Sequence, residues 1–146
     1  PPQQAGDIAH RAGVTDSSGW CPVESLSFES NRQTNIHVIG DAARAAPMPK
    51  SAFAANAQAK VCAIALVRLF RGLRPEPTVL ANTCYSYIKL AHAISITGAY
   101  RTDNGGFSAI AGAGGASPID ATQFFRPQEA AHAADWFTAI TRETFG

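Results

Sequence analysis

The sequence predicts an α+β fold in which one parallel strand and a long helix precede an antiparallel β meander and a C-terminal helix. A short run of β-branched residues at 35–41 leads into the longest apolar helical pattern of the chain, at 51–70. After Pro75 the pattern changes to strand-like runs over residues 78–112. This change divides the 146 residues into two expected domains, 1–75 and 76–146.

The first domain is expected to start with loops, interrupted by one short helix near residues 7–12. The strand predicted at 35–41 rests on β-branched residues, which are typical of a short buried strand: Ile36, Val38 and Ile39. Gly40 ends that strand, and its small size permits a sharp turn or a close approach of the backbone to a ligand.

The helix at 51–70 has a clear start and a clear end. Ser51 is expected to be its N-cap, because a serine oxygen there accepts a backbone N–H of the first turn. Gly72 and Pro75 stop the helix. Its buried face is expected to be an apolar stripe formed by Phe53, Ala57, Val61, Ile64, Ala65 and Leu69.

The second domain is expected to be a meander followed by a helix. Residues 103–106 read Asp-Asn-Gly-Gly, which predicts a tight hairpin because two of these residues readily take positive φ. The final helix is predicted at 126–142, with an apolar face made of Ala130, Ala133, Ala134, Phe137 and Ile140.

Composition excludes several classes of function. Apolar residues make up 46% of the chain, which indicates a folded core. The 12 basic and 11 acidic residues give a net charge of +1 without a basic run, so no nucleic-acid partner is expected. The three cysteines lack metal-ligand spacing, so no metal site is expected. We find no membrane-length apolar run and therefore expect no membrane insertion.

Asp41 is the first candidate binding residue. A carboxylate at the tip of a parallel strand lies where open α/β sheets bind ligands, and it can accept hydrogen bonds from hydroxyl groups. The helix that begins after Ser51 offers unpaired N–H groups and the positive end of its dipole to an electron-rich group. The alternative is that Asp41 caps the turn that follows it, since Gly-Asp after a strand is a common pattern.

The sequence around this pattern resembles a known family, the flavoprotein subunits of flavocytochrome c sulfide dehydrogenase, within the pyridine-nucleotide-disulfide oxidoreductase superfamily. The superfamily-level likeness lies in residues 36–43, 48–51 and 54–60. Three more specific stretches are Gly-Trp-Cys-Pro-Val at 19–23, Asn-Thr-Cys-Tyr-Ser at 82–86, and Thr-Arg-Glu-Thr-Phe-Gly at 141–146.

The resemblance implies that FAD is the cofactor. It assigns Asp41 to the ribityl chain of the flavin, places Gly40 beside it among the cofactor-binding residues, and implies that residues 48–51 lead into a helix aimed at the pyrimidine side of the ring. The four residues of that segment are Met48, Pro49, Lys50 and Ser51. Lys50 either adds positive charge at the flavin or is an ordinary solvated lysine, and residues 1–3 resemble a family loop that passes close to the flavin.

The resemblance also implies that Cys84 is one of two redox cysteines above the flavin. By itself, a lone cysteine on a strand is usually a small buried apolar residue. The second cysteine is expected upstream of residue 1, because Cys62 lies in the middle of a helix and Cys21 lies in a loop. Trp136 either packs near the flavin, towards a haem partner, or belongs to the ordinary core.

The expected function is oxidation of sulfide through Cys84, with electrons passing through FAD to a cytochrome c subunit in the periplasm. The family holds the ADP part of FAD with a Gly-x-Gly-x-x-Gly unit that is missing from these residues, so we expect the chain alone to be inactive. Two alternatives are open. One is an enzyme like the sulfide:quinone oxidoreductases, and the other is a non-catalytic module that forms a dimer or a cytochrome-docking surface through the C-terminal domain.

Overall fold

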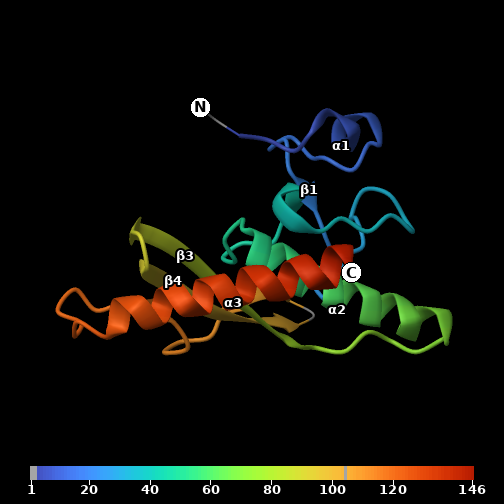
Figure 1. Ribbon diagram of the computed structural model, residues 1–146. Coiled ribbons are helices and arrows are strands. Elements are labelled where there is room, and N and C mark those ends of the chain that lie inside the picture. Colours follow the sequence, from blue (N-terminus) through green and yellow to red (C-terminus); the bar gives the residue numbers. More distant parts are fainter. Residues whose placement is uncertain (1–2, 104) are drawn as a thin grey trace. The chain divides into compact units, whose positions relative to one another are not determined.

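The computed structural model describes residues 3–103 and 105–146, and its α+β class is the one predicted (Figure 1). A two-stranded parallel sheet and a long helix are followed by a four-stranded antiparallel sheet and a C-terminal helix. In chain order the elements are α1 (Asp7–Arg11), β1 (Cys21–Pro22), the 3-10 helix η1 (Gly40–Ala42), β2 (Ala43–Arg44), α2 (Ala52–Phe70), β3 (Val79–Lys89), β4 (His92–Asp103), β5 (Gly106–Ala109), β6 (Gly115–Ala116) and α3 (Phe125–Phe145).

The chain forms two compact units. The first comprises Pro1–Asn82 with Ala99–Ile110, and the second comprises Thr83–Gly98 with Ala111–Gly146. Strands β3 and β4 each continue from one unit into the other. The domain boundary expected between residues 75 and 76 stays a prediction.

The parallel pairing of the first unit joins β1 to β2, with Cys21 opposite Ala43. The strand expected at 35–41 is therefore wrong in position. Apart from one isolated bridge to His37, those residues form a loop and the η1 turn. Asn35 has a φ of 62°, which breaks the extended run, and Ile39 is 39% exposed because nothing covers that side of the loop.

Helix α2 starts as predicted, since Ser51 Oγ accepts the backbone N–H of Ala54 at 3.1 Å. The predicted stripe is partly confirmed, since Ala65 is buried and Ala57 and Val61 pack against the core. Ile64 and Leu69 were wrongly placed in it, because they are 64% and 41% exposed. The buried face consists of small residues and one amide: Ala54, Gln58, Cys62 and Ala65. Small side chains let the helix approach the η1 turn closely, which places the larger apolar side chains outside.

Helix α2 is also long and apolar enough, by length and composition, to cross a membrane. The expectation that the sequence contains no such stretch is therefore wrong, although the core helix of a soluble protein passes the same test. The buried face of α2 packs in the core of the first unit, where Ala54 and Cys62 join Phe28 and Met48. The expected absence of membrane insertion stays a prediction.

The meander is confirmed. Asp103 pairs with Gly106 and Thr102 with Phe107, so β4 and β5 form the predicted hairpin, whose Asn104 lies outside the described residues. In the second unit, α3 packs along β3 (Figure 1), where the Tyr87 hydroxyl donates to the carbonyl oxygen of Ala130 at 2.9 Å.

The expected face of α3 is partly confirmed. Ala130 and Ala133 are buried, but Phe137 is 66% exposed. The third buried residue of this helix is a charged one, Glu129. The short N-terminal helix expected near residues 7–12 is present as α1.

Candidate functional site

An open cavity of about 340 Å³ in the first unit brings together two segments that the sequence analysis singled out. Gln3 belongs to the N-terminal loop, Asp41 lies in η1, and Lys50 lies in the loop between β2 and α2. The remaining lining residues are Gln4, Ala5, Gly6, Trp20 and Ala42. The cavity therefore offers a carboxylate, an ammonium group, two side-chain amides and an aromatic ring.

The Gly40–Asp41 turn is fixed by α2. Gly40 has a φ of 70°, a conformation that costs a residue with a Cβ about 1–2 kcal/mol. Its backbone N–H donates to Oε1 of Gln58 at 2.7 Å, and a Cβ built on Gly40 would lie 3.5 Å from the Cβ of Ala55. The turn therefore sits directly on the helix, and the exposed Asp41 projects from it at the cavity.

Gln58 was not among the predicted site residues. Its side chain is buried, with 3% of the residue exposed, and its Nε2 donates to the sulfur of Met48 at 3.3 Å. One amide thus contacts both Gly40 and Met48, near the two ends of the loop that joins η1 to α2. The sequence signals for this role are a polar residue among small residues on the buried face of α2 and the position of Gln58 within the stretch 54–60 that resembles the superfamily.

Lys50 is bound to the loop rather than free in solvent. Its Nζ donates to the carbonyl oxygens of Asp41 and Ala43, the latter at 3.2 Å, and lies 3.7 Å from the centre of the Trp20 ring. Burial lowers the pKa of Lys50, and the Asp41 carboxylate opposes that shift. The positive charge is therefore held in place at the wall of the cavity.

Ser51, Met48 and Pro49 support the loop. The Ser51 hydroxyl donates to Oδ1 of Asn82 at 2.5 Å while it caps α2, which ties the start of the helix to β3. Met48 is only 6% exposed and belongs to the core, and Pro49 is half-buried. None of these three lines the cavity.

Cys84 and Trp136 lie in the second unit. Tyr85 and Tyr87 face α3, since Tyr87 bonds to Ala130 and burial and the charge of Glu129 raise the pKa of Tyr85. Side chains alternate along a strand, so Cys84 projects from the opposite face of β3, where it is half-buried. Trp136 is half-buried on α3.

Glu129 is a second buried polar group that the sequence analysis missed. Its carboxylate accepts hydrogen bonds from the hydroxyls of Ser95 and Ser117, and it lies 3.6 Å from Nη1 of Arg126. These contacts join α3 to β4 and to the loop after β6 within the second unit. Satisfied hydrogen bonds of this kind indicate a structural role.

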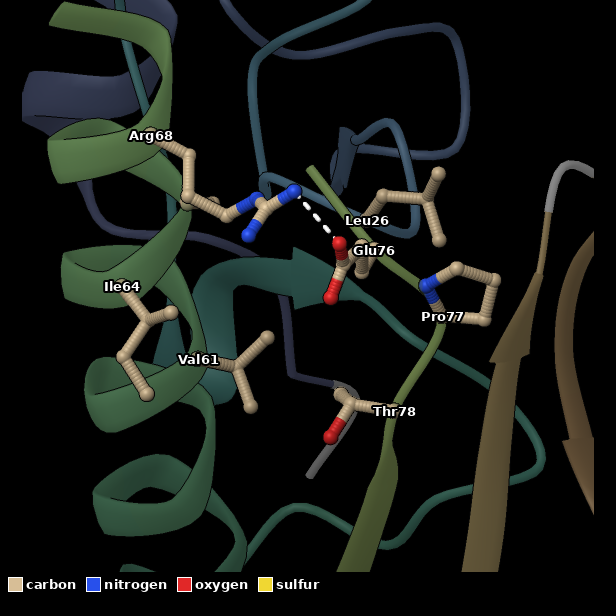
Figure 2. A pocket seen from close by; sticks show the side chains of 8 residues that line it. Leu26, Val61, Ile64, Arg68, Glu76, Pro77 and Thr78 are labelled. Atoms are coloured by element: carbon tan, nitrogen blue, oxygen red, sulfur yellow. Dashed lines mark hydrogen bonds and ion pairs between the residues drawn. The ribbon is translucent and has the colours of Figure 1, made fainter. Parts of the chain in front are cut away.

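A smaller cavity of about 150 Å³ lies between α2 and the segment before β3 (Figure 2). Val61, Ile64 and Leu26 supply apolar walls, while Arg68 pairs with Glu76 across its opening at 2.5 Å. The Arg68 guanidinium also donates to the carbonyl oxygen of Arg74 at 2.7 Å. The contacts of Arg68 with Arg74 and Glu76 therefore hold the turn after α2.

Residues 76–145 match a family model described as "Flavocytochrome c sulphide dehydrogenase, flavin-binding". The C-terminal part of this chain is therefore similar to the flavin-binding domain of that family. The resemblance stated from the sequence is therefore confirmed, and flavin is the cofactor of the domain. The chain is also similar to the mitochondrial sulfide:quinone oxidoreductase of Mus musculus, with 31% identity over 75 residues. That match covers 51% of this chain and 16% of the relative.

The groups around the cavity fit one part of a flavin dinucleotide. The Asp41 carboxylate is an acceptor for sugar-like hydroxyls, and the Lys50 ammonium is a donor for an electron-rich group. The first turn of α2 begins two residues after Lys50 and does not line the cavity. A volume of about 340 Å³ suits a part of such a cofactor. The part of the chain before residues 76–145 therefore carries a hydrogen-bond acceptor, Asp41, and a donor, Lys50, that suit a flavin cofactor.

Proposed function

We propose that this chain supplies the C-terminal, flavin-facing part of an FAD-dependent enzyme that oxidises sulfide. The observation that carries the proposal is the match of residues 76–145 to the flavin-binding domain of a sulfide dehydrogenase. The cavity at Asp41 and Lys50 supports it, because its donors and acceptor suit the flavin end of FAD. The chain alone is inactive in this proposal, because it lacks residues for the ADP part of the cofactor.

Each polar group at the cavity has a proposed part in binding. Asp41 accepts hydrogen bonds from the ribityl hydroxyls, and the turn at Gly40 sets its direction. The start of α2, capped by Ser51, faces the pyrimidine side of the ring. A helix N-terminus stabilises nearby negative charge by about 0.3–1 kcal/mol, and 1 kcal/mol corresponds to about 20 mV of a two-electron potential.

Cys84 is the proposed sulfur acceptor. Sulfide attacks a disulfide between Cys84 and a second cysteine, so that a new S–S bond forms on Cys84 and the other thiolate leaves. A second sulfide then takes the outer sulfur from Cys84 and releases its thiolate, and the two cysteine thiolates rejoin as a disulfide by giving two electrons to FAD, which is the oxidant that the cofactor would supply when bound. The half-buried Cys84 suits this chemistry better than Cys21 or Cys62, which are buried and whose pKa values are raised by that burial.

The proposed electron acceptor is a cytochrome c subunit, which would place the protein in the periplasm. In that assembly Trp136 on α3 packs between the flavin and the haem of the partner. The second candidate acceptor is a quinone, favoured by the similarity to a protein named sulfide:quinone oxidoreductase. The rates at which sulfide reduces cytochrome c and a soluble quinone in the presence of the enzyme show which of the two is its acceptor. Flotation with liposomes shows whether the enzyme binds a membrane.

The test of the redox cysteine uses the flavoprotein that contains this chain. Cys84→Ser is expected to abolish sulfide-dependent turnover while flavin content is unchanged. Cys62→Ala removes a thiol from the core of the first unit and is the matched control, expected to keep its turnover per folded molecule. Normal turnover in Cys84→Ser would remove Cys84 from the mechanism. A flavoprotein that binds cytochrome c but does not oxidise sulfide would instead favour a non-catalytic docking module.

A further inference from the structure

We infer that Gln58 is a positioning residue for the cofactor, which sets the Gly40–Asp41 turn from inside α2. The inference rests on the proposed function, because it concerns how Asp41 is presented to FAD. Gln58 lies on the most buried line of the helix, with 3% of its surface exposed. A buried amide is costly unless its oxygen and its N–H groups find partners, and both find them in the loop before the helix.

The oxygen of Gln58 fixes the direction of the turn. Gly40 occupies the left-handed region, with a φ of 70°, and its N–H points at Oε1 of Gln58 at 2.7 Å. This N–H belongs to the Ile39–Gly40 peptide, so the hydrogen bond fixes the peptide plane from which the chain turns at Gly40 into Asp41, the next residue. An apolar side chain at position 58 would leave the N–H of Gly40 without its acceptor and allow the turn to rotate.

The nitrogen of Gln58 fixes the other end of the loop. Nε2 donates to the sulfur of Met48, which is 6% exposed within the core. Lys50 follows two residues later and holds the carbonyl oxygens of Asp41 and Ala43. One side chain therefore holds the chain at Gly40, next to the cavity-lining Asp41, and at Met48, two residues before the cavity-lining Lys50.

Two substitutions separate the contact with Gly40 from the contact with Met48. Gln58→Met keeps the length of the side chain but removes both hydrogen bonds. Gln58→Glu keeps an oxygen acceptor for Gly40 and removes the donor to Met48. The readout is the dissociation constant of FAD for the reconstituted apoprotein of the flavoprotein that contains this chain, measured together with its thermal midpoint. Gln128→Met makes the same chemical change at an exposed position of α3 and is the control.

We expect Gln58→Met to weaken FAD binding by about tenfold, the effect of a buried donor left without its partner. Gln58→Glu is expected to retain most of the affinity, and Gln128→Met all of it. The decisive measurement is a double-mutant cycle with Asp41→Asn. If Gln58 acts through Asp41, the double variant binds FAD within about twofold of Asp41→Asn alone.

The outcomes distinguish this inference from the proposed function. If Asp41→Asn leaves the dissociation constant unchanged, the flavin site at Asp41 is wrong and the role of Gln58 falls with it. If Asp41→Asn weakens binding but the effect of Gln58→Met is absent or simply additive, only the positioning role is overturned. Equal losses in Gln58→Glu and Gln58→Met overturn the contact with Gly40 as the cause.

Discussion

The side-chain oxygen of Gln58 accepts a hydrogen bond from the backbone N–H of Gly40 at 2.7 Å, across 18 positions of the sequence. This contact joins the buried face of α2 to the turn that carries Asp41. The turn at the candidate cofactor site is therefore held by a buried residue in the core of the first unit. Substitutions at the turn should therefore alter both stability and cofactor binding.

Gly40→Ala is expected to lower the free energy of unfolding by about 1–2 kcal/mol, because alanine is strained at a φ of 70°. The space itself is available, since the nearest atom to a new Cβ is 3.5 Å away. Urea denaturation measures the change. Gly115→Ala is the control, because no atom lies within 4 Å of a Cβ there and its φ is not positive. Equal effects of the two substitutions would contradict the strain argument.

Ser51→Ala is expected to destabilise the protein by about 1 kcal/mol, the usual effect of removing a helix N-cap. The hydroxyl both accepts from Ala54 and donates to Asn82, so the loss reaches β3 as well as α2. Ser51→Thr retains a hydroxyl and should be close to the wild type. Thermal unfolding followed by circular dichroism compares them, and no loss in the alanine variant would show that the cap contributes little.

Glu129→Gln is expected to cost about 1–3 kcal/mol, because the buried carboxylate accepts two hydroxyl hydrogen bonds and faces Arg126. An amide replaces one acceptor oxygen by a donor and removes the charge. Asp135→Asn changes an exposed carboxylate on the same helix and should stay within about 0.5 kcal/mol of the wild type. Chemical denaturation gives the free energy of unfolding of both variants. A loss in Glu129→Gln without a loss in Asp135→Asn shows that the contacts of Glu129, and not merely a negative charge on the helix, stabilise α3.

Thiol labelling should distinguish the three cysteines. Cys21 is completely buried and Cys62 is 7% exposed, and burial raises the pKa of both thiols, so both resist alkylation near neutral pH. Cys84 is half-buried and should react first in the native protein. Peptide mass spectrometry after brief treatment with iodoacetamide gives the order of labelling. Faster labelling of Cys62 than of Cys84 would mean that α2 does not pack as described.

The sequence correctly predicted those parts of the fold that depend on residues close together in the chain. Ser51 caps α2, and residues 103–106 join β4 to β5, because a cap and a two-residue hairpin depend on residues close in the chain. The predicted strand at 35–41 failed because β-branched residues favour extended backbone without creating a partner. The parallel pairing formed instead at Ala43, opposite Cys21.

The supporting residues could not be predicted because their partners are distant. Periodicity placed Ile64 and Leu69 inside, but the close approach of α2 to the Gly40 turn selected the face of Ala54 and Gln58. Glu129 was not predicted as a buried group, because its partner Ser95 lies 34 positions earlier in the sequence. Gly40, Asp41 and Lys50 were predicted from a local pattern and from the family resemblance, and Asp41 and Lys50 both line the cavity, while their part in binding stays a prediction.

The most direct test of the account is an anaerobic titration of the flavoprotein that contains this chain with sulfide, followed through its flavin absorbance. The account predicts that sulfide bleaches the flavin, because each sulfide delivers two electrons to one FAD. A flavin that stays oxidised in excess sulfide, yet is bleached by dithionite, would contradict the central claim that these residues belong to a sulfide-oxidising enzyme.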